Sequence, residues 1–176
     1  VRMHADRARR AVSIAGFEEL EPLVPAMLTA QQVVEIAASH FARIARVTVD
    51  AGAHMFPATM LWPVSEPNEM LISNGLSTMG FALPAAIGAG LLDRSRPVVA
   101  LTGDGGLLIC TGELATVARE RLRVTTIVLN DASLSLIEIK QQARKLAPAG
   151  VALGSIDWTK IGAGFGMTTW TVRTVE

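Results

Sequence analysis

The sequence of 176 residues contains a single cysteine, Cys110, and no tyrosine. One cysteine cannot form an intrachain disulfide, which excludes the small disulfide-stapled folds of secreted proteins. A reducing compartment is the simpler expectation, so we expect a cytoplasmic protein. Cys110 itself is expected to be a buried, unreactive thiol rather than a nucleophile.

An excess of charge of either sign is also absent. Lysine plus arginine and aspartate plus glutamate both number 16, so bulk charge does not favour binding to nucleic acid or to an anionic membrane. Long hydrophobic runs are lacking too. The longest candidate, residues 76–92, is interrupted by Pro84 and falls short of the roughly 20 residues that a membrane span needs. We expect a buried helix there, in a globular chain of which half the residues are hydrophobic.

A strand, a glycine-rich turn, a helix and a second strand form the centre of the predicted fold. Residues 97–102 are apolar and bounded by Pro and Gly, which predicts a buried strand ending in Gly103-Asp104-Gly105-Gly106. A helical pattern follows around 113–121, and a second apolar strand, 124–129, ends in Asn130-Asp131. Parallel strands joined by a crossover helix place both acidic side chains at the carboxyl edge of the sheet, where open α/β sheets bind ligands.

The remaining elements are predicted from the same patterns. We expect helices at 30–42, with Thr29 as N-cap, from 75 to about 92 and at 157–166; strands at 46–50 and 167–172; and loops at 55–67 and 147–155. His54 follows the end of a strand and so falls on the same edge as the two aspartates. His4 and His40 have no such position, and we expect both at the surface.

The acidic side chains and glycines predict a site for a metal ion and an anion. Asp104 stands among three glycines, whose backbone amides can approach an oxyanion without a Cβ in the way, and Asp131 can supply a second oxygen. Mg²⁺ prefers such oxygen ligands and commonly shares its coordination sphere with phosphates. Neither the dinucleotide fingerprint nor the P-loop follows the strand, so a metal-bridged diphosphate fits better than either nucleotide site.

Three motifs, in order along the chain, resemble those of thiamine diphosphate enzymes. Gly103-Asp104-Gly105, followed after 24 residues by Asn130-Asp131, is similar to the family's metal and diphosphate motif. Residues 73–88 closely resemble the cofactor-contacting segment of acetolactate synthase-like enzymes, and residues 50–54 resemble a segment that carries a diphosphate-contacting histidine. The resemblance covers roughly residues 28–166. It implies a three-layer α/β/α fold with a mainly parallel sheet, specifically the diphosphate-binding domain.

The resemblance also implies roles for individual residues. The side chains of Asp104 and Asp131 and the backbone carbonyl of Ser133 would hold magnesium. The carbonyl of Ser77 and the amide of Met79 would hold the aminopyrimidine, and the bulk of Met79 would keep the cofactor bent. The remaining implied cofactor contacts are Gly52, His54, Gly103, Gly105 and Gly106. In the family, residues 147–155 would fold over the cofactor.

The family's catalytic glutamate lies in an amino-terminal domain that this chain lacks, so we expect no catalytic residue here and assign Glu113 a structural role. We expect residues 1–27 to be a linker or the end of a preceding domain, and residues 28–176 to be the cofactor domain of a longer enzyme, inactive in isolation. In the family the cofactor lies between domains of two subunits, which implies a homodimer or tetramer.

The implied activity is decarboxylation or carboligation of a 2-oxo acid with thiamine diphosphate and magnesium. Two departures bear on it: Asp131 replaces the family's usual asparagine, and residues 134–142 lack an expected Gly-Met pair and tryptophan. Two alternatives therefore stand beside an acetolactate synthase-like carboligase. One is a decarboxylase of aromatic or branched 2-oxo acids, and the other is a degenerate, non-catalytic domain that only pairs subunits.

Overall fold

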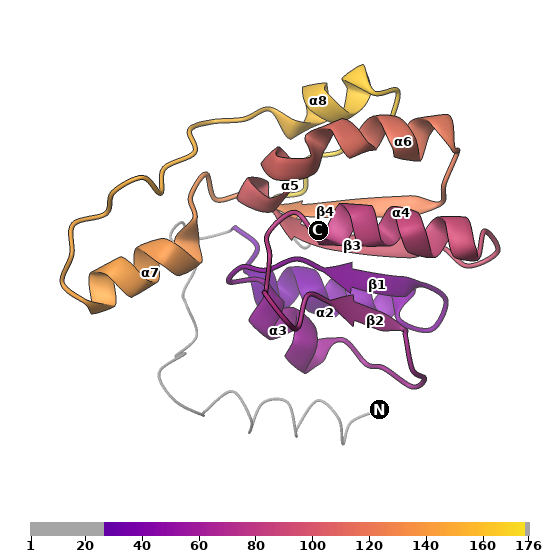
Figure 1. Ribbon diagram of the computed structural model, residues 1–176, viewed down its shortest axis with the longest axis horizontal. Coiled ribbons are helices and arrows are strands. Elements are labelled where there is room, and N and C mark those ends of the chain that lie inside the picture. Colours follow the sequence, from indigo (N-terminus) through magenta and orange to yellow (C-terminus); the bar gives the residue numbers. More distant parts are fainter. Residues whose placement is uncertain (1–26, 175–176) are drawn as a thin grey trace.

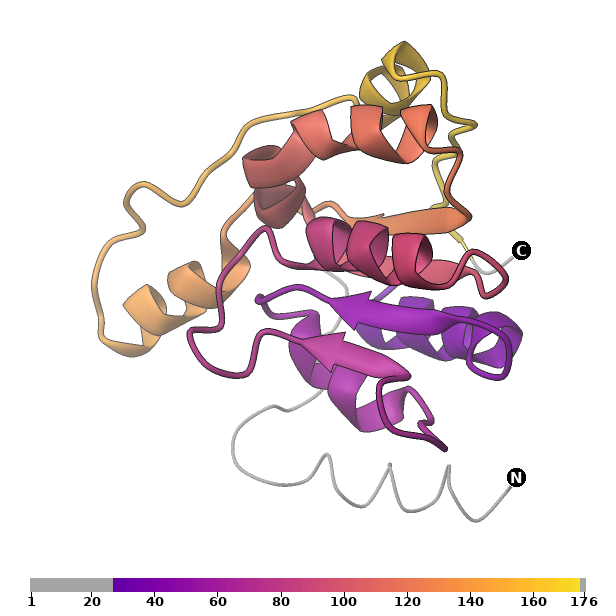
Figure 2. The same cartoon turned by 45° about the vertical axis from the view of Figure 1, so that its right-hand side comes forward.

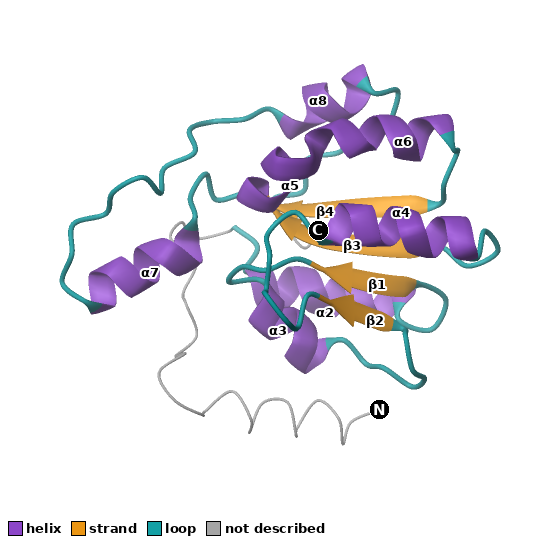
Figure 3. Ribbon diagram, in the orientation of Figure 1, coloured by secondary structure: helices purple, strands orange, loops and turns teal. Residues whose placement is uncertain are grey.

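The computed structural model describes residues 27–174, which form a parallel sheet with helices on both faces (Figure 1). The strands are β1 (Arg46–Val49), β2 (Met70–Ile72), β3 (Val98–Gly103) and β4 (Val124–Leu129). Their order in the sheet is β2-β1-β3-β4, and all three pairings are parallel. Figure 3 shows every arrowhead pointing toward the same edge, so the carboxyl ends of the strands meet there. The predicted carboxyl edge is confirmed.

Two groups of helices cover the two faces of this sheet (Figures 1 and 2). One face carries α2 (Ala30–Phe41) and α3 (Met55–Leu61), and the other carries α4 (Ala82–Leu92), α5 (Asp104–Cys110), the 3₁₀ turn η1 (Thr111–Glu113), α6 (Leu114–Arg119) and α8 (Trp158–Gly164). The helix α7 (Ser135–Ala143) projects beyond the carboxyl edge of the sheet in both views. The three-layer α/β/α prediction is confirmed.

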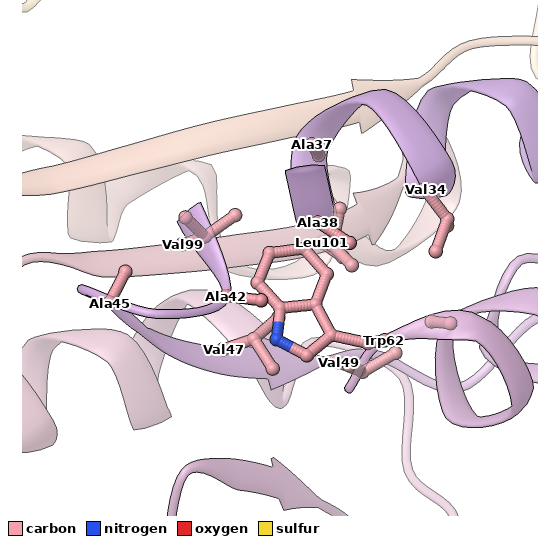
Figure 4. Packing of buried hydrophobic residues seen from close by; sticks show 11 residues of the cluster. Val34, Ala37, Ala38, Ala42, Ala45, Val47, Val49, Trp62, Val99 and Leu101 are labelled. Atoms are coloured by element: carbon pink, nitrogen blue, oxygen red, sulfur yellow. The ribbon is translucent and has the colours of Figure 1, made fainter. Parts of the chain in front are cut away.

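The strand β3 shows why the sheet needs cover on both sides. Its side chains alternate: Val99 and Leu101 pack with α2 and α3, whereas Val98 and Ala100 pack beneath α4. All four are fully buried, as expected for a central parallel strand. Figure 4 shows the first of these clusters, with the indole of Trp62 lying among aliphatic side chains of α2, β1 and β3.

The predicted first helix is confirmed, with a defined start. Thr29 is its N-cap: the Thr29 hydroxyl accepts from the Gln32 amide, and the Gln32 side chain accepts from the Thr29 amide at 2.9 Å. This capping box satisfies two of the helix's free amides. The predicted last helix is also confirmed, with Asp157 as its N-cap and Gly166 at φ 77° after its end.

Two parts of the segment before α4 differ from the sequence predictions. Residues 75–81 are not helical, because Ser77 (φ 49°) and Gly80 (φ 77°) have left-handed backbone conformations that end any helical path, so α4 begins only at Ala82. Residues 55–67 are not all loop, since they contain α3. The three-residue strand β2 was not predicted; it is too short to show an alternating pattern.

The predicted strand at 167–172 is wrong. These residues have no strand pairing in the described part of the chain, and Trp170 and Val172 are 77% and 70% exposed. Contact with α8 gives the physical reason. The Thr169 hydroxyl donates to the Thr159 carbonyl at 3.2 Å, and the Thr169 methyl lies so close to Gly162 that a Cβ there would meet it. The segment therefore follows α8 instead of adding to the edge of the sheet.

The other surface predictions have mixed outcomes. His40 is exposed as expected, whereas His4 and the predicted linker at 1–27 fall almost wholly outside the described residues. Within residues 27–174, no helix is long and apolar enough to cross a membrane. The apolar run 76–92 is instead divided between an exposed turn and α4, whose Leu83 and Ala86 are fully buried.

Candidate functional site

Asp104 lies at the carboxyl edge of the sheet as the first residue of α5, directly after β3. Its side chain is 2% exposed. One carboxylate oxygen accepts from the Gly105 amide at 2.7 Å, and the other accepts from the Ala132 amide at 2.7 Å. The second bond ties the end of β3 to the segment after β4. Each oxygen keeps a further lone pair, because a carboxylate can accept about four hydrogen bonds in total.

The electrostatics of Asp104 favour a cation. Burial raises the pKa of this carboxyl above its ordinary value, and the neighbouring charge of Asp131 raises the pKa further, while the Gly105 and Ala132 amides lower it. Among the described residues, no lysine or arginine forms an ion pair with either carboxylate. A bound divalent cation would offset the cost of keeping both charges at this edge.

Asp131 and Ser133 occupy a tight turn after β4. The side chain of Asp131 accepts from the Ser133 amide at 3.2 Å and from the Ser135 hydroxyl. Ser133 is fixed from two other directions: its hydroxyl donates to Glu138 at 2.7 Å, and its backbone pairs with Ala152 in an isolated antiparallel bridge. The structure therefore brings the two predicted carboxylates and the Ser133 backbone to one place.

The bridge at Ser133 also holds part of the loop between α7 and α8 in place. The Leu134 amide donates to the Val151 carbonyl and the Leu153 amide donates to the Ala132 carbonyl, both at 2.9 Å. Val151 is 5% exposed. This part of the predicted 147–155 loop thus lies against the Asp131 turn in the structure.

His54 reaches the same edge from the segment after β1. Its ring is buried, at 7% exposed, and Nε2 has no hydrogen-bond partner within residues 27–174. Burial lowers the pKa of His54, and the charges of Asp50 and Asp131 together with a hydrogen bond to the Asp50 backbone oppose this shift. A buried ring nitrogen without a partner costs free energy, so this atom is available for a ligand.

Close packing around the His54 ring accounts for two of the predicted glycines. A Cβ on Gly52 would lie 2.6 Å from Cε1 of His54, and a Cβ on Gly103 would lie 3.4 Å from the same atom. Gly52 therefore has no room for a side chain while the ring holds its place. Gly52, His54 and Gly103 form one packed unit.

Gly105 lies against side chains from two other segments of the chain. A Cβ there would lie 2.5 Å from Cδ2 of Leu134 and 3.0 Å from Cε of Met79. Met79 is thus close to the start of α5. Ser77 is exposed, in a turn that the Ser73 hydroxyl closes by accepting from the Thr78 amide at 3.2 Å.

The sequence analysis missed Asp50, which is the most connected side chain at this edge. It is fully buried and accepts four hydrogen bonds, from the amides of Ala51, Gly80 and Phe81 and from the Thr102 hydroxyl. The signal was an aspartate directly after an apolar strand and two residues before a glycine. Only the spatial approach of residues 80–81 shows what it does.

Cys110 and Glu113 lie beside the site without contributing to it. Cys110 is half-buried rather than fully buried as predicted, and burial raises the pKa of its thiol to about 11, which agrees with an unreactive thiol. Glu113 is exposed in η1.

The donors at this edge suit a hard cation. No three His, Cys, Asp or Glu side chains cluster as a ligand set in residues 27–174. The oxygens on offer are two carboxylates and a backbone carbonyl, which fits Mg²⁺ because this ion usually completes its octahedron with water and phosphate oxygens. The His54 nitrogen that has no partner among the described residues fits an anionic group beside this cation.

Comparison with known proteins assigns this arrangement to a family. Residues 50–176 match the model of the thiamine pyrophosphate enzyme C-terminal TPP-binding domain. The chain belongs to this family. The match includes Asp50, His54, Asp104 and Asp131, and it confirms the resemblance found in the sequence.

Curated relatives place the domain more narrowly. This TPP-binding domain is 39% identical over 127 residues to the acetolactate synthase isozyme 1 large subunit of Escherichia coli K12, covering 70% of this chain and 22% of that protein. It is 37% identical over 122 residues to the acetolactate synthase of Bacillus subtilis 168, covering 69% and 21%. The chain thus spans about a fifth of the length of these relatives. The TPP-binding domain is therefore similar to those of acetolactate synthases.

A solved structure supports the fold. The thiamine diphosphate-dependent 4-hydroxybenzoylformate decarboxylase of Rhodococcus jostii RHA1 superposes with a TM-score of 0.78 at 23% identity. The match covers 92% of this chain and 30% of that one. The TPP-binding domain therefore shares most of its fold with one part of a larger protein.

Proposed function

We propose that this TPP-binding domain holds the diphosphate of thiamine diphosphate through a magnesium ion bound by Asp104, Asp131 and the carbonyl of Ser133. The observation that carries the proposal is the placement of Asp104. This buried carboxylate is hydrogen-bonded to the segment that carries Asp131 and Ser133, and each of its oxygens keeps a lone pair.

The surrounding residues have complementary tasks in this proposal. Nε2 of His54 bonds a diphosphate oxygen, and Gly52 and Gly103 leave space for its ring. Gly105 and Gly106 let the diphosphate approach the backbone at the start of α5. The carbonyl of Ser77 and the amide of Met79 hold the aminopyrimidine, with the Met79 side chain supporting the bend between the two rings.

The enzyme that contains this domain decarboxylates or joins 2-oxo acids in this proposal. Bound thiamine diphosphate supplies the carbanion-stabilising chemistry, and these residues bind and orient it. The proposal includes a cytoplasmic homodimer or tetramer, with the catalytic glutamate on a domain outside this chain, so residues 1–176 alone are inactive. The similarity to acetolactate synthases favours carboligation.

A decarboxylase of aromatic or branched 2-oxo acids is the second candidate. The sequence of α7 and of the residue before it favours this candidate, because residues 134–142 lack the Gly-Met pair and tryptophan expected of a biosynthetic acetolactate synthase. Incubation of the protein at its natural length with pyruvate or with benzoylformate separates the two. Acetolactate from pyruvate supports the first, and benzaldehyde from benzoylformate supports the second.

Calorimetric titration of thiamine diphosphate tests the proposed site. Binding is expected with Mg²⁺ and is lost with a chelator or in Asp104→Ala. Asp131→Asn is the matched control, because it keeps an oxygen at the position and restores the residue usual in the family, so we expect it to bind. Titration begins with the 176-residue chain and is repeated at natural length. Binding at natural length that is changed neither by the chelator nor by Asp104→Ala contradicts the proposal.

A further inference from the structure

Asp50 is the buried acid at this edge that the proposed site does not use. Its four hydrogen bonds use all the acceptor capacity of a carboxylate, so it has no lone pair left for a metal ion or a proton transfer. It is also the point where three chain segments meet. These are the end of β1, the end of β3 at Thr102 and the turn before α4 at Gly80 and Phe81.

Each of the two carboxylate oxygens of Asp50 binds one backbone amide of the turn before α4. Oδ2 accepts from the Gly80 amide at 3.1 Å, and Oδ1 accepts from the Phe81 amide at 3.2 Å. Consecutive amides held by one carboxylate fix both the position and the orientation of the backbone. These amides directly follow Met79, in a turn whose left-handed conformations at Ser77 and Gly80 provide no regular helical hydrogen bonding of their own.

Asp50 also contacts the diphosphate side of the site. A Cβ on Gly106 would collide with Oδ2 of Asp50 and would lie 2.8 Å from the Thr102 hydroxyl. The first turn of α5 is therefore packed directly against this carboxylate. One side chain thus touches both halves of the proposed site, while Met79 approaches Gly105 from the other side.

We propose that Asp50 is a positioning residue that sets the distance between the Ser77–Met79 turn and the diphosphate turn at Gly105-Gly106. This inference rests on the proposed function. Its consequence is selective: loss of the Asp50 carboxylate displaces the contacts to the aminopyrimidine and leaves the metal ligands Asp104, Asp131 and Ser133, which hold the diphosphate through Mg²⁺, in place.

Asp50→Asn is the informative substitution. Both oxygens of Asp50 bind an amide of the turn, so an asparagine must direct its NH₂ group at one of these N–H groups whichever way it is oriented. Thr102→Val is the matched control, because it removes the 2.9 Å bond to the same carboxylate and leaves the turn's two bonds intact. A cost typical of a hydrogen bond to a charged group corresponds to a loss of affinity of about tenfold or more.

The assay uses the protein at its natural length, freed of cofactor, with saturating Mg²⁺ and two probes, thiamine diphosphate and inorganic diphosphate. In Asp50→Asn we expect the Kd for thiamine diphosphate to rise about tenfold or more. The Kd for inorganic diphosphate should stay within about twofold, an effect smaller than one ordinary hydrogen bond. In Thr102→Val, the Kd values for both probes should stay within about twofold. A structural role alone would weaken both probes equally in Asp50→Asn.

Three results overturn the inference: equal weakening of both probes, no weakening of thiamine diphosphate, or the same selective loss in Thr102→Val. If the unsubstituted protein binds neither probe, the proposed function itself fails, which is a distinguishable result. If Asp50→Asn does not fold, hydrogen exchange in the unsubstituted protein decides. The Gly80 and Phe81 amides should then be protected without cofactor, and their free exchange would overturn the inference.

Discussion

Replacing Gly52 by alanine should destabilise the domain through a single identifiable contact. A Cβ at this position would lie 2.6 Å from Cε1 and 2.8 Å from Nδ1 of His54. The ring is 7% exposed and so cannot move into solvent without leaving its packed position. Overpacking of this kind costs about 1–3 kcal/mol. Gly52 does not have a left-handed φ, so alanine is otherwise compatible with the backbone.

A double-mutant cycle separates the collision from other effects of the substitution. In a His54→Ala background the ring is gone, and Gly52→Ala should be neutral or stabilising by up to about 1 kcal/mol because alanine reduces the freedom of the unfolded chain. The coupling between the two substitutions should therefore be about 1–4 kcal/mol, which overlaps the roughly 0.5–3 kcal/mol typical of residues in direct contact.

Urea denaturation of the 176-residue chain followed by circular dichroism measures each corner of the cycle. With an m-value of roughly 2 kcal/mol/M, a loss of about 2 kcal/mol lowers the midpoint by about 1 M. The m-value itself should not change. Equal costs for Gly52→Ala with and without the His54 ring would refute the reasoning, since the destabilisation would then come from something other than this contact.

Four further predictions follow from burial and charge. Burial raises the pKa of Asp104, so its protonation should weaken magnesium-dependent cofactor binding at a higher pH than protonation of an ordinary aspartate would. Binding titrations across pH 4–7 measure this pH dependence, and Asp104→Asn should flatten it. For the same reason, the free energy of unfolding of the metal-free domain should rise as the pH falls through the raised pKa of Asp104. Saturating Mg²⁺ should diminish this gain. The pKa of His54 is lowered, so its contribution to stability is complete above the ordinary histidine value of 6.5 and declines as the pH falls below it; urea midpoints that decline identically in His54→Gln would contradict this. Leu83→Ala in α4 should cost about 2–5 kcal/mol because the side chain is fully buried, whereas Leu92→Ala, at 84% exposed, should change the urea midpoint little.

Much of the fold was predictable because its signals are local. The strands β1, β3 and β4 are short apolar runs bounded by breakers, and the Thr29 and Asp157 caps mark the starts of α2 and α8. In a parallel sheet, moreover, the carboxyl ends of all strands lie at the same edge, so the residues that follow each strand can be placed there from the sequence. The positions of Asp104, Asp131 and His54 at one edge of the sheet therefore followed from the strand ends alone.

The errors fall where local patterns are outweighed by contacts from elsewhere. Residues 75–81 have small and apolar residues typical of a buried helix, yet the turn is held by Asp50, a side chain 30 and 31 positions away from the amides it binds. Residues 167–172 have the composition of a strand, yet Thr169 is held against α8 by a bond to Thr159. In both cases a contact from outside the segment decided the conformation.

The sequence by itself determined which groups are available for chemistry here, since two carboxylates, glycines and a histidine after strand ends predict a metal and diphosphate site, and the motifs around them resemble the family. Only the tertiary structure decided how these groups are held. The burial that raises the pKa of Asp104, the missing partner of His54 Nε2 and the fourfold bonding of Asp50 all arise from segments that are distant along the chain. Desolvation and hydrogen bonding depend on which atoms surround a group, and folding alone brings those atoms together.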